Sequence, residues 1–125
     1  MSGPHVLVVE DNGRNMKLVR DVLEAKGFAT LEAWTGEEAI ALARAHAPAL
    51  VLMDVHLPGI DGVETLVRLR SDERTAAIPV LAVTAQAMHG DRERFVAAGF
   101  DGYLAKPVDL VELISTVEGY CGRPA

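Results

Sequence analysis

The chain has 125 residues, of which 50% are hydrophobic, and its 12 Lys and Arg against 18 Asp and Glu give a net charge of −6. A chain of this length can bury a core without disulfides or a structural metal, and the single cysteine, Cys121, has no partner in the chain. The acidic balance argues against a nucleic-acid partner, because phosphate backbones are bound by clustered Lys and Arg. The apolar runs are too short to span a membrane, and the N-terminus has no secretory signal pattern. We therefore expect one soluble domain over residues 1–125, located in the cytoplasm and without membrane contact.

Five short apolar runs, rich in β-branched residues or leucine, are typical of strands. The predicted strands are Val6 to Val9, Ala29 to Ala33, Leu50 to Met53, Val80 to Val83 and Gly102 to Ala105. Between the strands, apolar residues recur at helical spacing. The predicted helix faces are Met16, Val19, Val22 and Leu23, then Ala39, Ile40 and Ala43, then Val63, Leu66, Val67 and Leu69. Alternating charges over 91–94 indicate a solvated helix face.

The last predicted helix covers residues 109–120 and begins at Asp109, with Glu112 at the spacing of a capping box. Its apolar face consists of Leu110, Leu113, Ile114 and Val117. The whole chain thus repeats strand and helix five times, and near-continuous apolar strands indicate a sheet covered on both faces. The fold class is predicted as α/β, a doubly wound parallel sheet of five strands with five helices. Short joints rich in Gly and Pro leave no room for an interdomain linker.

Polar residues follow the predicted strands where a parallel sheet binds its ligands, outside the carboxyl ends. Glu10 and Asp11 follow the first strand, Asp54 the third, Thr84 the fourth and Lys106 the fifth. Three converging carboxylates raise the pKa of at least one of them or require a cation. A small set of hard oxygen ligands suits Mg²⁺ better than Zn²⁺ or Ca²⁺. A hydroxyl and an ammonium at the same edge can bind phosphoryl oxygens.

Each of these residues also has a simpler structural explanation. Acids after strands are often helix caps, and a lone lysine is most often a surface residue. Asp54 follows the most apolar strand, where an unpaired carboxylate is costly, although it could cap the turn that follows. Because all of these features fall at one edge of the sheet, we favour a functional site over a coincidence of structural residues.

The ordered set Glu10-Asp11, Asp54 with 57–62 behind it, Thr84-Ala85 and Lys106-Pro107 resembles the receiver domain of two-component response regulators, over essentially the whole chain. The resemblance implies the flavodoxin-like strand order 2-1-3-4-5. The segments 9–12, 15–18, 83–85 and 87–88 are most similar to the stand-alone regulators of the DivK type. Because only five residues follow Tyr120, we expect no output domain, although a receiver excised from a hybrid kinase or a larger regulator would look similar.

By the resemblance, Asp54 is the phosphoacceptor, which takes a phosphoryl group from a phosphohistidine on a sensor histidine kinase or a histidine phosphotransferase. Mg²⁺, or Mn²⁺ in its place, is expected to bind Asp11, Asp54 and the main-chain carbonyl of His56, with Glu10 reaching it through water. The chain would catalyse only its own phosphorylation and dephosphorylation, so it is not expected to be an enzyme acting on other substrates.

By the same resemblance, Lys106 and Thr84 are expected to contact the oxygens of the phosphoryl group. The peptide bond between Lys106 and Pro107 is expected to be cis. Thr84 and Tyr103 would form the switch, the alternative for Tyr103 being a partly buried aromatic whose hydroxyl always faces water. His56 and Gln86 stand where receivers tune the lifetime of the phosphoryl group, although a solvated imidazole explains His56 equally well. We expect a monomer or weak dimer that binds downstream proteins through its fourth helix, fifth strand and fifth helix, near Arg92, Phe95, Tyr103 and Leu113.

Three other functions fit the sequence less well. Phosphatases of the haloacid dehalogenase type have the motif Asp-x-Asp-x-Thr at the nucleophile. This chain has Asp-Val-His-Leu-Pro from residue 54, which lacks the second acid and the threonine. A flavin-binding module would need a phosphate loop rich in Ser, Thr and Gly after the first strand, where carboxylates stand instead. A receiver that binds partners without phosphorylation is disfavoured because every site residue is present.

Overall fold

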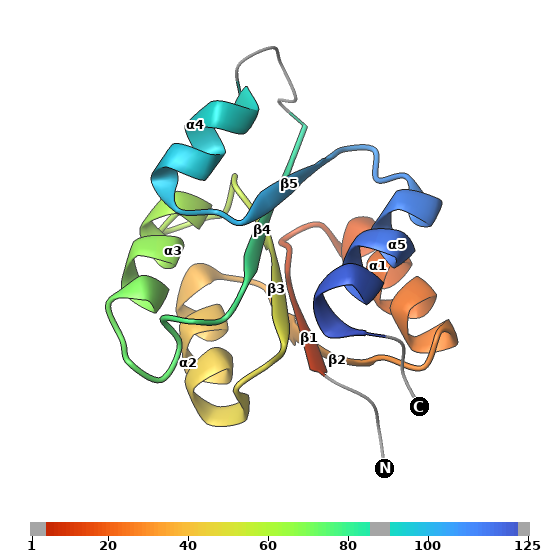
Figure 1. Cartoon of the computed structure of the whole chain (residues 1–125), viewed down its shortest axis with the longest axis horizontal. Coiled ribbons are helices and arrows are strands. Elements are labelled where there is room, and N and C mark those ends of the chain that lie inside the picture. The colour runs from red at the N-terminus through yellow and green to blue at the C-terminus, as the bar shows by residue number, and fades with distance from the viewer. Residues whose placement is uncertain (1–4, 86–90, 123–125) are drawn as a thin grey trace.

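The computed structural model of the chain describes residues 5–85 and 91–122, without the side chains at 91 and 92. In these ranges strands and helices alternate along the chain (Figure 1). The strands are β1 (His5–Val9), β2 (Ala29–Ala33), β3 (Leu50–Asp54), β4 (Val80–Thr84) and β5 (Gly102–Ala105). The helices are α1 (Gly13–Ala25), α2 (Gly36–His46), α3 (Gly62–Arg70), α4 (Asp91–Ala98) and α5 (Leu110–Cys121).

The strands form one parallel sheet in the order β2-β1-β3-β4-β5, which confirms the predicted topology. The third and fourth strands extend one residue further than predicted. Asp54 is paired in register with Val83, and Thr84 with Ala105. Both polar residues are therefore the last residues of their strands and are held by the sheet ladder itself.

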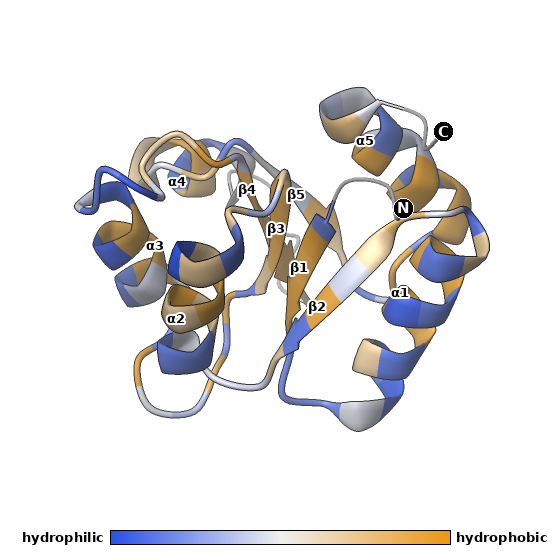
Figure 2. Cartoon of the chain, turned by 90° about the horizontal axis from the view of Figure 1, so that it is seen from below, coloured by the Kyte–Doolittle hydropathy of each residue, from blue (hydrophilic) through white to orange (hydrophobic). Residues whose placement is uncertain are grey.

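Helices cover both faces of the sheet, as the apolar strands predict. Helices α1 and α5 lie on one face, and α2, α3 and α4 lie on the other (Figures 1 and 2). All residues of β3 and β4 are buried, whereas the edge strands β2 and β5 are partly exposed. The two faces give two hydrophobic clusters, one on each side of the sheet.

The predicted apolar face of α3 is only partly right. Leu66 and Leu69 are buried, but Val63 and Val67 are 36% and 50% exposed. The buried face instead includes Gly62 and Thr65. The four buried residues of α3 therefore have the helical spacing i, i+3, i+4 and i+7. The helix places its smallest residue, Gly62, toward the sheet.

Gly62 allows α3 to start directly against β3. A Cβ atom at this position would lie 2.7 Å from the carbonyl oxygen of Asp54 and 2.8 Å from the Cα of Val55. Asp61 caps the helix, since its side chain accepts a hydrogen bond from the Glu64 N–H. The chain thus turns from the end of β3 into α3 within a short loop.

Helix α5 begins as predicted, because Asp109 accepts hydrogen bonds from the N–H groups of Val111 and Glu112. Leu113 and Val117 are buried, whereas Leu110 is 39% exposed. Cys121 is half-buried at the end of the helix, and burial raises the pKa of its thiol. In the described part of the chain, no helix has the length and apolar character needed to cross a bilayer.

Candidate functional site

The site lies at the carboxyl edge of the sheet, where β1, β3, β4 and β5 end side by side. Glu10 follows β1, Asp54 ends β3, Thr84 ends β4 and Lys106 follows β5. Because the strands are parallel, their carboxyl ends lie on the same edge. The structure therefore brings together residues that are up to 96 positions apart in the sequence, from 10 to 106.

Three carboxylates form an acidic cluster at this edge. One oxygen each of Glu10, Asp11 and Asp54 lies within 4.8 Å of the other two. Glu10 and Asp54 are 5% and 4% exposed, whereas Asp11 is exposed to solvent. Two buried acids and one accessible acid leave one open side from which a cation can approach.

Lys106 bridges the two buried carboxylates. Its Nζ lies 2.8 Å from Oε1 of Glu10 and 3.1 Å from Oδ2 of Asp54. Its backbone N–H donates a hydrogen bond of 2.8 Å to the carbonyl of Thr84, and its peptide bond to Pro107 is cis, as expected. Burial opposes the charge on Lys106, but the two carboxylates outweigh it, so the pKa of the lysine is raised.

The charge of the site is not balanced by its own residues. Burial raises the pKa of Glu10, and the neighbouring Asp54 adds to this effect, while Lys106 opposes it. Three carboxylates face a single lysine, so the fully ionised cluster carries excess negative charge. Oxygen ligands with uncompensated charge and one accessible member fit a hard divalent cation such as Mg²⁺.

Backbone N–H groups hold the two buried carboxylates in place. The N–H of His56 donates to Oδ1 of Asp54 at 2.9 Å, and the N–H of Asn12 donates to Oε2 of Glu10 at 3.1 Å. Asp54 therefore caps the turn that follows it and also faces Lys106. The capping explanation weighed from the sequence therefore applies to this residue, and the functional explanation stays a prediction.

The remaining predicted site residues lie at different depths. Thr84 is buried, and the side chain of His56 is exposed. Tyr103 is half-buried on β5, and its ring centroid is 6.1 Å from that of Phe95 on α4. Gln86 lies outside the described residues.

Two of the residues near which the output face was predicted are buried. Phe95 and Leu113 are 3% and 1% exposed, so they belong to the core and cannot contact a partner directly. The side chain of Arg92 lies outside the described part of the chain. The residues that reach the surface between β5 and α5 include Tyr103 and Glu112, which line a groove of about 390 Å³.

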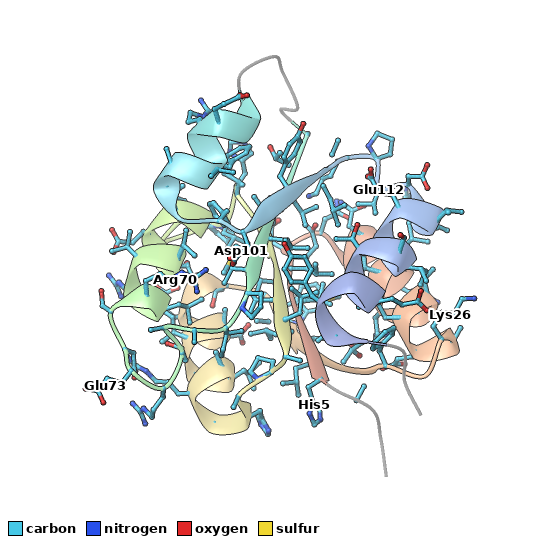
Figure 3. All side chains as sticks on the ribbon, viewed as in Figure 1. His5, Lys26, Arg70, Glu73, Asp101 and Glu112 are labelled. Carbon is cyan, nitrogen blue, oxygen red and sulfur yellow. The ribbon has the colours of Figure 1, made fainter. Side chains whose placement is uncertain are left out.

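Sequence reasoning missed two sets of supporting residues. Asn12, and not one of the acids before it, caps α1 by accepting hydrogen bonds from the N–H groups of Arg14 and Asn15. An Asn just before a helical pattern is a recognised cap signal and could have identified it. At the opposite edge of the sheet, the side chains of Arg70 and Asp101 point toward one another (Figure 3). Nη2 of Arg70 lies 2.9 Å from Oδ2 of Asp101.

The fold and the site define an α/β domain with an acidic cluster at the carboxyl edge of its parallel sheet, and comparison with known proteins gives its family. Residues 6–118 match the response regulator receiver domain. The chain therefore belongs to this family and is a receiver domain of the two-component response regulator type.

Individual relatives agree with this assignment. The chain is 47% identical over 117 residues to the polar-differentiation response regulator DivK of Brucella ovis. The matched region covers 94% of this chain and 95% of the relative. Its structure is similar, with a TM-score of 0.88 and 33% identity, to the receiver domain of the sensor histidine kinase PA1611 from Pseudomonas aeruginosa, over 97% and 99% of the two chains. That receiver domain holds a magnesium ion in its active-site cleft.

A third relative was solved together with a phosphotransfer partner. It is the receiver domain of the response regulator Ssk1 from Saccharomyces cerevisiae, in complex with the histidine phosphotransfer signaling protein Ypd1. This chain is 25% identical to it, with a TM-score of 0.87, over 96% and 90% of the two chains.

Proposed function

We propose that Asp54 accepts a phosphoryl group from a phosphohistidine on a sensor histidine kinase or a histidine phosphotransferase. The observation that carries the proposal is the contact of Lys106 with both Glu10 and Asp54 beside the accessible Asp11. An oxygen of the Asp54 carboxylate attacks phosphorus, the P–N bond of the phosphohistidine breaks, and the imidazole leaves. The products are an aspartyl phosphate and a free histidine.

The residues of the cluster fit a Mg²⁺ ion. Asp11, Asp54 and the main-chain carbonyl of His56 would hold the ion, and Glu10 would act through a water molecule; Mn²⁺ would substitute. When bound, the ion neutralises charge on the transferring group. Lys106 keeps the Asp54 carboxylate oriented and pairs with phosphoryl oxygens once they arrive, which compensates the charge that the group brings into the site.

The signal would pass from the site through Thr84 and Tyr103. A hydroxyl at the end of β4 can donate a hydrogen bond to a phosphoryl oxygen, and its movement would let Tyr103 turn inward beside Phe95. Such a change acts only if it biases an element with two arrangements. The surface formed by α4, β5 and α5 would then bind downstream proteins, with the groove that Tyr103 and Glu112 line as its centre.

His56, two residues after Asp54, would influence attack by water on the aspartyl phosphate, and Gln86 would share this role; the exposure of the His56 side chain fits a solvated imidazole equally well. The chain would then catalyse only its own phosphorylation and dephosphorylation. The single-domain organisation, the cytoplasmic location and the monomer or weak dimer state stay predictions from the sequence.

The proposal is tested by incubating the chain with Mg²⁺ and acetyl phosphate and measuring its intact mass. We expect the wild type to gain one phosphoryl group that is stable in acid and labile in base, and Asp54→Asn to gain none. Asp61→Asn is the matched control, because asparagine keeps the cap of α3 and leaves the site unchanged. Equal phosphorylation of wild type and Asp54→Asn would show that Asp54 is not the acceptor. Steady hydrolysis of simple phosphate esters would instead support the phosphatase alternative.

A further inference from the structure

Helices α2 and α3 lie side by side on one face of the sheet (Figures 1 and 2), and a pocket of about 670 Å³ opens between them toward their carboxyl ends. It is lined by Ile40 and Arg44 of α2, by Arg68 of α3 and by residues 71–74 of the loop that follows α3. Both helices run opposite to the strands, so the pocket lies toward the edge of the sheet opposite the acidic cluster. It is therefore separate from the site described above.

Three arginines line this pocket, although the chain as a whole has a net charge of −6. Two of them share one carboxylate: Nε of Arg44 lies 2.6 Å, and Nη2 of Arg74 lies 3.2 Å, from Oδ2 of Asp72. The third, Arg68, pairs with Glu64 on its own helix at 3.2 Å. Two guanidinium groups that face a single carboxylate leave one positive charge uncompensated.

The two arginines that share Asp72 also have donors left for a ligand. Asp72 accepts hydrogen bonds from Nε of Arg44 and from Nε, Nη2 and the backbone N–H of Arg74. These contacts, those of Arg74 first, lower the pKa of Asp72 to about 2, so its carboxylate stays ionised at neutral pH and holds the two guanidinium groups together. Within the described ranges neither side chain has another hydrogen-bond or ion-pair partner, which leaves both terminal nitrogens of Arg44 and Nη1 of Arg74 available. The other acid of the lining, Glu73, is exposed and extends away from the molecule (Figure 3).

The size and charge of the pocket favour a small anion over an acidic protein. Its volume falls in the range of about 300–1,000 Å³ that is typical of small-molecule sites. A large acidic partner would face a chain with a net charge of −6, whereas a small anion meets chiefly the arginines. Guanidinium groups bind phosphate oxygens through paired hydrogen bonds and stack on planar rings. Ile40 adds an apolar contact to the lining.

We propose that this pocket binds a nucleotide through its phosphates, with Arg44 and Arg74 as the phosphate ligands. The available terminal nitrogens of the two arginines would donate hydrogen bonds to phosphate oxygens, which compensates the positive charge that Asp72 leaves over. The base would lie against Ile40 and the guanidinium plane of Arg68. Binding here goes beyond the proposed phosphorylation of Asp54, which takes place at the other edge of the sheet.

The first test is isothermal titration calorimetry of the full chain with ATP in EDTA, so that no metal at the acidic cluster can hold the nucleotide. We expect one site per chain. Arg44→Gln and Arg74→Gln should each raise the dissociation constant about 10-fold, because each removes charge-assisted hydrogen bonds to phosphate. Both side chains are largely exposed, so the variants should fold. Arg94→Gln is the matched control, since it removes the same charge from an exposed position on α4, outside the pocket.

The second test separates the parts of the ligand. Inorganic tripolyphosphate should compete with ATP, because the phosphates make the contacts with the arginines, and adenosine should not compete at the same concentration. Arg74→Lys keeps the charge but loses the paired donors of the guanidinium group. Its dissociation constant for ATP should therefore lie between those of the wild type and Arg74→Gln.

Several results would overturn the proposal. If millimolar ATP gives no binding, the pocket is not a nucleotide site, and if Arg94→Gln weakens binding as much as Arg74→Gln, the attraction is general and not located in the pocket. Binding of adenosine as tight as that of ATP would exclude the arginines as ligands. A short polyglutamate peptide that binds more tightly than ATP would show that the pocket serves an acidic protein segment. All variants should still gain a phosphoryl group from acetyl phosphate, so failure here leaves the proposed phosphorylation of Asp54 untouched.

Discussion

Burial of Glu10 affects the acid–base chemistry of the site. It is almost fully buried beside a second carboxylate, and its compensation comes from Lys106 and one backbone N–H. Its pKa is raised above the ordinary value of 4.5. A cation that binds here would therefore displace a proton at low pH, which couples metal binding to pH.

This raised pKa predicts how stability depends on pH without metal. A carboxyl group with a higher pKa in the folded chain costs stability as pH rises above the unfolded value, because the folded state gives up a proton it holds more tightly. Glu10→Gln removes this cost and keeps an oxygen for the Asn12 N–H. In EDTA, we expect urea unfolding to show Glu10→Gln more stable than wild type at about pH 7, with the difference shrinking toward about pH 4.

Addition of Mg²⁺ should reverse this order at neutral pH. The ion stabilises the folded chain in proportion to its affinity, and the variant has lost one of the three carboxylates. A difference between variant and wild type that did not change with pH would contradict the assigned role of Glu10 burial.

At the scale of elements, close approach between β3 and α3 positions the loop that follows Asp54. The backbone N–H of Gly62 donates to the carbonyl of Val55 at 3.0 Å, and the absent side chain lets the helix lie against the strand end. Both atoms that a Cβ would meet most closely belong to backbone, which cannot rotate away. The geometry of the loop after Asp54, the proposed phosphoacceptor, therefore depends on a glycine outside the acidic cluster.

We predict that Gly62→Ala destabilises the chain by about 2 kcal/mol, because α3 or the end of β3 must shift. Gly119→Ala is the control in a helix with open space around the position, and it should stabilise the chain by about 0.5 kcal/mol. Urea unfolding measures both. If the two substitutions gave the same change, close packing at Gly62 would not be the cause.

At the scale of the whole molecule, Arg70 joins segments at the edge of the sheet opposite the site. Its guanidinium donates to the carbonyls of Ala76, Ile78 and Gly99 and to the carboxylate of Asp101. The same carboxylate accepts the N–H of Val80 at 2.8 Å. One side chain at the end of α3 thus fixes the entries of both β4 and β5.

Arg70→Ala should destabilise the chain by about 2 kcal/mol, because several carbonyls and a carboxylate lose a charged donor. Arg68→Ala is the matched control. Among the described residues Arg68 pairs with the exposed Glu64 on its own helix, so its loss should cost less than about 0.5 kcal/mol. The two variants are compared by urea unfolding. A cost for Arg70→Ala no larger than that for Arg68→Ala would remove Arg70 from this role.

The sequence by itself determined the order of the elements, the parallel sheet and the cluster at its carboxyl edge. These follow from local information, since apolar periodicity gives strands and helices, and parallel strands necessarily bring Glu10, Asp54 and Lys106 to one edge. Even the strand ends were placed within one residue. The family resemblance added the roles proposed for these residues, which geometry alone does not assign.

Only the tertiary structure decided which apolar residues are buried. Val67 and Leu110 fit the helical patterns as well as Leu69 and Leu113 do, yet they face solvent. The spacing of apolar residues indicates which side of a helix faces the core. How many residues on that side are buried depends on how closely the helix packs on the sheet. The long-range contacts of Arg70 could not be predicted either, because they join segments that are distant in sequence and that only packing brings together.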